Sequence, residues 1–154
     1  IHGGFGTDLR WKNLSLRVDF NWSANKWMRN ADLFFITDNN NAASSNQRTV
    51  MMNVWTTPGQ ITDIPKVGET IQQGDTRWLE DASYVRLKNL TLAYNLPQYL
   101  CNKAGLSGVQ LHFTGRNLLT FTDFTGLDPE PETTTVFFFY PNTRQYEFGL
   151  NVSF

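Results

Sequence analysis

Residues 14–22 read LSLRVDFNW, and every second side chain in this stretch is apolar. The positions between them carry polar or charged side chains, including Arg17 and Asp19. A period of two residues is typical of a β-strand, because successive side chains point to opposite faces of a sheet. The stretch therefore predicts a strand with one apolar face and one polar face.

The same alternation recurs on both sides of this stretch. Residues 5–11 alternate in the same way, and only Lys12 and Asn13 separate the two runs, which indicates a two-residue hairpin. Further alternating runs at residues 84–96, 109–114 and 146–154 predict three more strands. The sequence therefore predicts about five strands.

The links between the predicted strands alternate between shorter and longer. They are Lys12-Asn13, residues 23–83, residues 97–108 and residues 120–142. A soluble domain rarely carries a connection as long as the second, whereas outer-membrane barrels have short periplasmic turns and long extracellular loops. No run of 18 apolar residues predicts a transmembrane helix, but alternating transmembrane strands keep a low mean hydropathy.

These observations predict an all-β fold of antiparallel strands from a transmembrane β-barrel with long extracellular loops. Five strands cannot close a barrel, for which about eight is the minimum. We therefore expect residues 1–154 to be incomplete as a functional unit. Counting strands places the C-terminus on the periplasmic side and residues 23–83 outside the cell.

The predicted strand at residues 84–96 changes phase in its middle. Either a bulge near Asn89 or an upper half that projects beyond the membrane and packs inward explains this. In the long connection, residues 46–55 predict a short helix with Ser44 or Ser45 as its cap. Residues 38–45 are small and polar, which predicts an exposed loop tip.

Composition argues against several functional classes. The net charge of −1 indicates neither nucleic acid nor an anionic membrane surface as a partner. Cys101 is the only cysteine and the two histidines lie far apart, so no metal site is expected. Glu80 and Asp81 are adjacent on a strand and point to opposite faces, which disfavours a glycosidase pair. We expect no enzyme activity and no cofactor.

The polar faces of the strands provide the first candidate site. In a barrel these side chains meet water, the plug or the substrate, and a hydrated wall is the simpler interpretation. The side chains that we expect to face lipid are Leu14, Leu16, Phe20, Leu92, Phe113, Phe148, Leu150 and Val152. The lumen-facing candidates are Arg17, Asp19, Asn21, Thr114 and Arg116.

Three tryptophans in or beside the long connection provide a second set of candidates. Aromatic faces suit sugar rings because they bury the apolar face of the ring. Packing within the loop, or contact with a lid protein, is favoured over sugar stacking for any one of them. The candidates for ligand or lid contact are Trp27, Trp55 and Trp78.

Several motifs resemble the C-terminal region of the SusC/RagA family of TonB-dependent transporters. The most specific are residues 81–92, DASYVRLKNLTL, and the ending at residues 148–154, FGLNVSF. Other similar stretches are GGFGT at 3–7, GRNL at 115–118 and GLDPE at 126–130. Residues 55–58, WTTP, depart from the contiguous WTP that is usual in the family.

The resemblance implies that residues 1–154 are the C-terminal antiparallel strands of a large transmembrane barrel, of roughly 22 strands and with a plugged lumen. It implies that the chain is a fragment, with the plug and most of the barrel upstream. It implies import of oligosaccharides, or sometimes peptides, across the outer membrane of Bacteroidetes. The implied partners are the lipid bilayer, a SusD-like surface lipoprotein that caps the barrel, and TonB, which engages the N-terminal part.

The last predicted strand also resembles the terminal signal that the barrel assembly machinery reads. The alternative role of Phe154 is a place in the periplasmic aromatic girdle. The signal residues are Tyr146, Phe148, Leu150, Val152 and Phe154.

The competing fold is a soluble carbohydrate-binding β-sandwich, whose strands also alternate. A sandwich does not explain the alternation of shorter and longer links.

Overall fold

The computed structural model describes residues 1–38, 40, 44–69 and 74–154. The chain divides into two compact units. The sheet unit consists of Ile1–Lys26, Ser83–Thr122 and Pro141–Phe154, and the loop unit of Trp27–Ala82 and Asp123–Tyr140.

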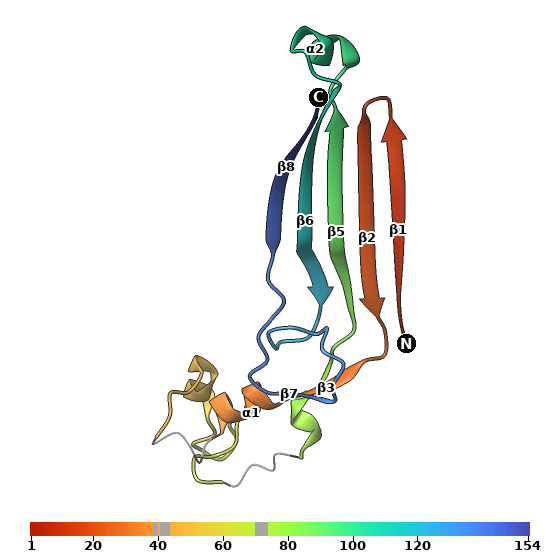
Figure 1. Ribbon diagram of the computed structural model, residues 1–154. Helices are drawn as coiled ribbons and strands as arrows, with labels where there is room; N and C mark the ends of the chain where they lie inside the picture. The colour runs from red at the N-terminus through yellow and green to blue at the C-terminus, as the bar shows by residue number, and fades with distance from the viewer. Residues whose placement is uncertain (39, 41–43, 70–73) are drawn as a thin grey trace. The chain divides into compact units, whose positions relative to one another are not determined.

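One five-stranded antiparallel sheet forms the body of the sheet unit (Figure 1). Its strand order is β1-β2-β5-β6-β8. The strands are β1 His2–Trp11, β2 Leu14–Ser23, β5 Tyr84–Asn95, β6 Gly108–Thr122 and β8 Gln145–Ser153. The five predicted strands are thus confirmed, and β6 continues past the alternating run at 109–114 to Thr122, just inside the predicted link 120–142.

The hairpin between β1 and β2 has the two-residue connection that the sequence predicts. Trp11 pairs with Leu14 across it. Lys12 adopts a φ of 53°, a left-handed conformation that short hairpin turns need at their first loop position. The connection between β5 and β6 contains α2, Gln98–Lys103, which the sequence analysis did not predict.

The phase change in β5 is a bulge. Asp19 of β2 pairs with Asn89, and the next residue, Phe20, pairs with Leu87, so Lys88 is passed over. The extra residue brings Val85 and Leu87 onto the same face as Leu90. The structure therefore supports the bulge and does not require an inward-packing upper half.

One face of the sheet is apolar across all five strands. Partner residues in neighbouring strands lie side by side on the same face of a sheet. One row across the sheet is Leu9, Leu16, Leu92, Phe113 and Phe148, and the next is Trp11, Leu14, Tyr94, Leu111 and Leu150. Much of this apolar face is exposed, with Phe148 at 80% and Leu150 at 59%.

The loop unit contains a second, smaller sheet with the order β4-β3-β7. Its β3–β7 pair is parallel. The elements of the unit are β3 Trp27–Asn30, α1 Ala31–Thr37, η2 Thr49–Asn53, η3 Thr76–Trp78, β4 Leu79–Asp81 and β7 Thr135–Val136. None of the described helices is long and apolar enough to cross a membrane.

The loop unit has its own small core. Met28, Ala82, Phe124 and Val136 form a buried cluster. Trp78 is only 3% exposed and packs edge-on against Phe34, with ring centroids 5.5 Å apart. The predicted long connection, residues 23–83, is therefore part of a packed structure.

Polar side chains tie the segments of this unit together. The side chain of Asn30 caps α1 by accepting a hydrogen bond from Leu33 N at 3.0 Å. Glu80 of β4 accepts hydrogen bonds from the backbone N of Thr125 at 2.8 Å and from the Asn30 amide at 3.3 Å. A carboxylate that accepts several hydrogen bonds fixes three separate segments at one point.

The predictions for the long connection were partly wrong. Within residues 46–55 only the short 3-10 helix η2 forms, and its N-cap is Arg48 without a side-chain hydrogen bond, so the Ser44 or Ser45 cap is wrong. Residues 39 and 41–43 of the predicted exposed tip lie outside the described residues. Among the described residues of the tip, Asn40, Ser44 and Ser45 are exposed as predicted, whereas Asp38 is buried, at 7%.

We predict that Trp78→Ala will destabilise the loop unit by about 3–5 kcal/mol, as expected for loss of a buried large aromatic. Hydrogen exchange of the amides of α1 and β3 in the intact protein measures the effect. Trp27→Ala is the matched control, because Trp27 is 57% exposed and its removal leaves little cavity. Equal protection factors in the two variants would contradict the packing of Trp78.

We predict that Gly149→Ala will destabilise the sheet by about 1–3 kcal/mol through overpacking. A Cβ at Gly149 would overlap the ring of its pairing partner His112. The thermal unfolding midpoint of the intact protein should fall, and His112→Ala should restore it in the double variant. Gly108→Ala is the control, since a Cβ there meets nothing within 4 Å.

Candidate functional site

The polar face of the sheet carries the first group of candidate residues. Strand register brings Arg17, Thr91, Thr114 and Glu147 into one row, and Asp19, Asn89, Arg116 and Gln145 into the next. Asn21 lies in a further row, beside Arg86. All five lumen-facing candidates therefore share one face, opposite Leu16 and Phe20. That this face lines a lumen stays a prediction.

Side-chain hydrogen bonds order the centre of this polar face. Asp19 Oδ2 accepts hydrogen bonds from Arg17 Nε at 3.0 Å and from Asn89 Nδ2 at 3.2 Å. Arg17 is 57% exposed and Asp19 31%, so water screens the pair and it contributes little to stability. Its effect is to fix the direction of the guanidinium and the carboxylate on the sheet surface.

The neighbouring strands extend this pattern towards β8. The hydroxyls of Thr91 and Thr114 lie 3.3 Å apart. Arg116 places its Nη2 3.6 Å from Glu147 Oε2 and donates from Nη1 to Gln145 at 3.4 Å. The face thus presents interspersed positive, negative and neutral polar groups, which suits water or a polar solute and does not select one sign of charge.

The part of the chain that the structure describes contains no cluster of metal-ligating side chains. There, no group of three or more His, Cys, Asp or Glu side chains is placed to hold a metal ion. Cys101 is 1% exposed, in α2. Packing accounts for a small buried thiol of this kind.

The three tryptophan candidates have different surroundings. Trp27 is 57% exposed and is the first residue of β3. Trp55 is half-buried, and its backbone N donates to Ile64 O at 3.0 Å. Trp78 is buried and packs against Phe34, which agrees with the packing interpretation for this residue.

The predicted terminal signal residues lie along β8. Every second residue of β8 lies on the apolar face and pairs with a residue of β6; these residues are Tyr146, Phe148, Leu150 and Val152. Phe154 directly follows the strand and is 92% exposed. β8 is an edge strand of this sheet, so one side of its backbone has no partner strand within the sheet.

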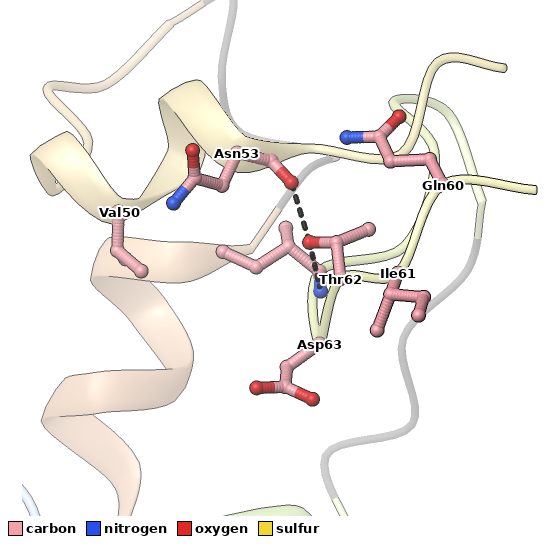
Figure 2. Close-up of a pocket in the computed structure, with 7 residues that line it drawn as sticks. Val50, Asn53, Gln60, Ile61, Thr62 and Asp63 are labelled. Carbon is pink, nitrogen blue, oxygen red and sulfur yellow. Dashed lines mark hydrogen bonds between the residues drawn. The ribbon is translucent and has the colours of Figure 1, made fainter.

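A pocket in the loop unit escaped the sequence analysis. It has a volume of about 350 Å³ and lies between η2 and the segment that follows it (Figure 2). The residues that line it are Val50, Asn53, Gln60, Ile61, Thr62, Asp63 and Ile64. The alternation and helix patterns of the sequence gave no signal that the chain folds back beside η2.

The backbone around this pocket is held by side-chain hydrogen bonds. Gln60 accepts a hydrogen bond from Thr56 N at 2.8 Å and donates one to Val54 O at 3.1 Å. Gly59, with a φ of 88°, lets the chain turn between these groups. The Thr62 hydroxyl donates to Asn53 O and accepts from Ile64 N (Figure 2).

Two curated proteins of Formosa agariphila are similar to this chain along nearly its whole length. TonB-dependent receptor P3 is 36% identical over 163 residues, and TonB-dependent receptor P26 is 30% identical over 176 residues. Each alignment covers 98% of this chain and 16% of the receptor. The chain therefore spans about one sixth of the length of these relatives. No protein-family model matches the chain.

Solved structures of the RagAB peptide importer match the fold. In both its open-open and closed-closed states the similarity has a TM-score of 0.89 with 40% sequence identity. The match covers 99% of this chain and 17% of the importer chain. Sequence, strand order and fold agree, and the chain is a barrel segment of a TonB-dependent receptor of the SusC/RagA family.

Proposed function

We propose that residues 1–154 are the C-terminal part of an outer-membrane transporter barrel that imports oligosaccharides or peptides. The observation that carries this proposal is the division of the five-stranded sheet into a continuous apolar face and a continuous polar face. The two rows traced above run from β1 to β8 without a polar interruption, and the next row is polar only at Thr7, at the β1 edge of the sheet. Such a face is stable in contact with lipid and unfavourable in contact with water.

The strand lengths support a membrane-spanning sheet. A tilted transmembrane strand needs about 9–11 residues. β1 and β2 have 10 residues each and β8 has 9. β5 and β6, with 12 and 15 residues, are long enough to continue beyond the lipid.

The polar face then lines the lumen, where it meets water, plug or cargo. The loop unit belongs on the extracellular side, where a SusD-like surface lipoprotein caps the barrel. TonB supplies energy through the N-terminal part of the receptor, and the barrel assembly machinery inserts the finished strands. The similarity to a peptide importer supports peptides as cargo, while the curated relatives, named only as receptors, leave oligosaccharides equally open.

The second candidate function, a soluble carbohydrate-binding sandwich, requires another sheet against the apolar face. The sheet unit, all of whose residues are described, contains one sheet. Its apolar side chains remain largely exposed. These observations favour the barrel.

We predict that Leu150→Arg will cost roughly 2–4 kcal/mol of folding stability in the full-length receptor if Leu150 lies near the middle of the bilayer. Unfolding in lipid vesicles measures the loss. Asn151→Arg is the matched control, because the neighbouring side chain points to the polar face. Equal effects of the two substitutions would assign the apolar face to something other than lipid, and folding of the receptor without detergent or lipid would exclude the barrel.

We predict that deletion of Phe154 will lower the yield of assembled, heat-modifiable receptor and increase its periplasmic degradation. Recognition of the last strand must come before membrane insertion, because an unpaired strand edge cannot enter lipid alone. The thermal stability of the receptor that does assemble should change little. Normal yield with reduced stability would instead make Phe154 a girdle residue.

A further inference from the structure

A second cavity adjoins the pocket of Figure 2. Its volume is about 170 Å³, and Val50, Asp63 and Ile64 line both. The remaining walls of the second cavity come from Leu33, Thr37, Arg77 and Trp78. The two cavities are therefore neighbouring compartments of one groove in the loop unit, which we name the strap groove.

The compartments differ in chemistry. In the larger one, Asn53 and Asp63 have side chains without a hydrogen-bond or ion-pair partner among the described residues, whereas Gln60 and Thr62 use theirs to hold the backbone. The smaller compartment is lined mainly by aliphatic groups of Leu33, Val50 and Ile64. The groove thus combines the amide of Asn53 and the carboxylate of Asp63, which have no partner among the described residues, with an apolar compartment.

This combination fits a peptide better than a sugar. A primary amide offers a donor and an acceptor together, which matches the C=O and N–H of an extended peptide. A sugar ring is best held by an open aromatic face. Among the described residues that line the groove, the only aromatic one is the buried Trp78, whose ring centroid lies 5.5 Å from the Arg77 guanidinium. The Asp63 carboxylate is exposed and complements a cationic side chain.

We propose that the strap groove binds an extended segment of peptide cargo, with an aliphatic side chain in the smaller compartment and an adjacent basic side chain at Asp63. Asn53 holds the peptide backbone between them. This inference rests on the proposed transport function and narrows its cargo to peptides that carry an aliphatic–basic pair.

The test uses the full-length receptor in detergent and fluorescence anisotropy of end-capped, dye-labelled peptides. The probe GSGLKGSG carries the aliphatic–basic pair, GSGLEGSG reverses the charge, and a linear hexasaccharide represents the other class of cargo. Asp63→Asn should weaken binding of the Leu-Lys peptide about threefold to fivefold, as expected for an exposed ion pair. The loss should diminish as salt concentration rises.

Glu69→Gln is the matched control. Glu69 is also an exposed carboxylate of the loop unit but does not line the groove, so its neutralisation changes the charge equally and should leave binding unchanged. Asp63→Lys should reverse the preference between the Leu-Lys and Leu-Glu peptides. A general disturbance of the loop would not produce that reversal, and heat-modifiability of each variant checks that the barrel has assembled.

The possible failures are distinguishable. If the wild type binds the Leu-Lys peptide but Asp63→Asn and Glu69→Gln behave alike, the groove is not the peptide site, while the transport function stands. If the wild type binds only the hexasaccharide, the peptide inference is wrong. If cells take up neither kind of cargo in a TonB-dependent manner, the proposed function itself fails.

Discussion

Strand register is the constraint on which the rest of the sheet unit depends. Side chains in a sheet alternate with a period of two, so a slip of one residue moves every apolar side chain of a strand to the other face. Leu16 lies beside Leu92, and Leu92 beside Phe113, only because the hydrogen-bond ladders hold this alignment. The bulge at Lys88 follows from the same constraint, since without it Val85 and Leu87 would join the polar face. The ordered arrangement of Arg17, Asp19 and Asn89 is a further result of this register.

The sheet could be predicted because each strand shows its pattern within its own short stretch of sequence. The alternation of apolar and polar residues can be seen within residues 14–22 alone, and the phase change near Asn89 can be seen within one strand. The loop unit was not predictable in the same way. Its strands β4 and β7 have three and two residues, too few to display a period, and β3 and β7 are parallel partners separated by about a hundred positions in the chain. Short elements that depend on distant partners leave little pattern in a sequence.

The candidate sites also differ in whether a local pattern of the sequence reveals them. The five polar-face residues were found because alternation places them together whatever the fold of the loops. The tryptophans were chosen for residue type alone, and type does not distinguish the exposed Trp27 from the buried Trp78. The strap groove gave no signal, because it exists only where the chain after Gly59 folds back beside η2. Within the loop unit the tie at Glu80 is similarly non-local: Asn30, Glu80 and Thr125 meet although no motif links them.

In the strap groove, holding the backbone and offering side chains to a ligand fall largely to different residues. Binding loops often combine these two tasks in the same residues. The side chains of Gln60 and Thr62 bond to Val54, Thr56, Asn53 and Ile64 through backbone or hydroxyl groups, and so they define the path of the chain. Val50, Ile61 and Asp63 line the groove without taking part in those bonds through their side chains. Replacing Val50, Ile61 or Asp63 therefore leaves the supporting hydrogen bonds intact. Such an arrangement lets a receptor acquire a new preference by single substitutions, with its loop architecture preserved at each step.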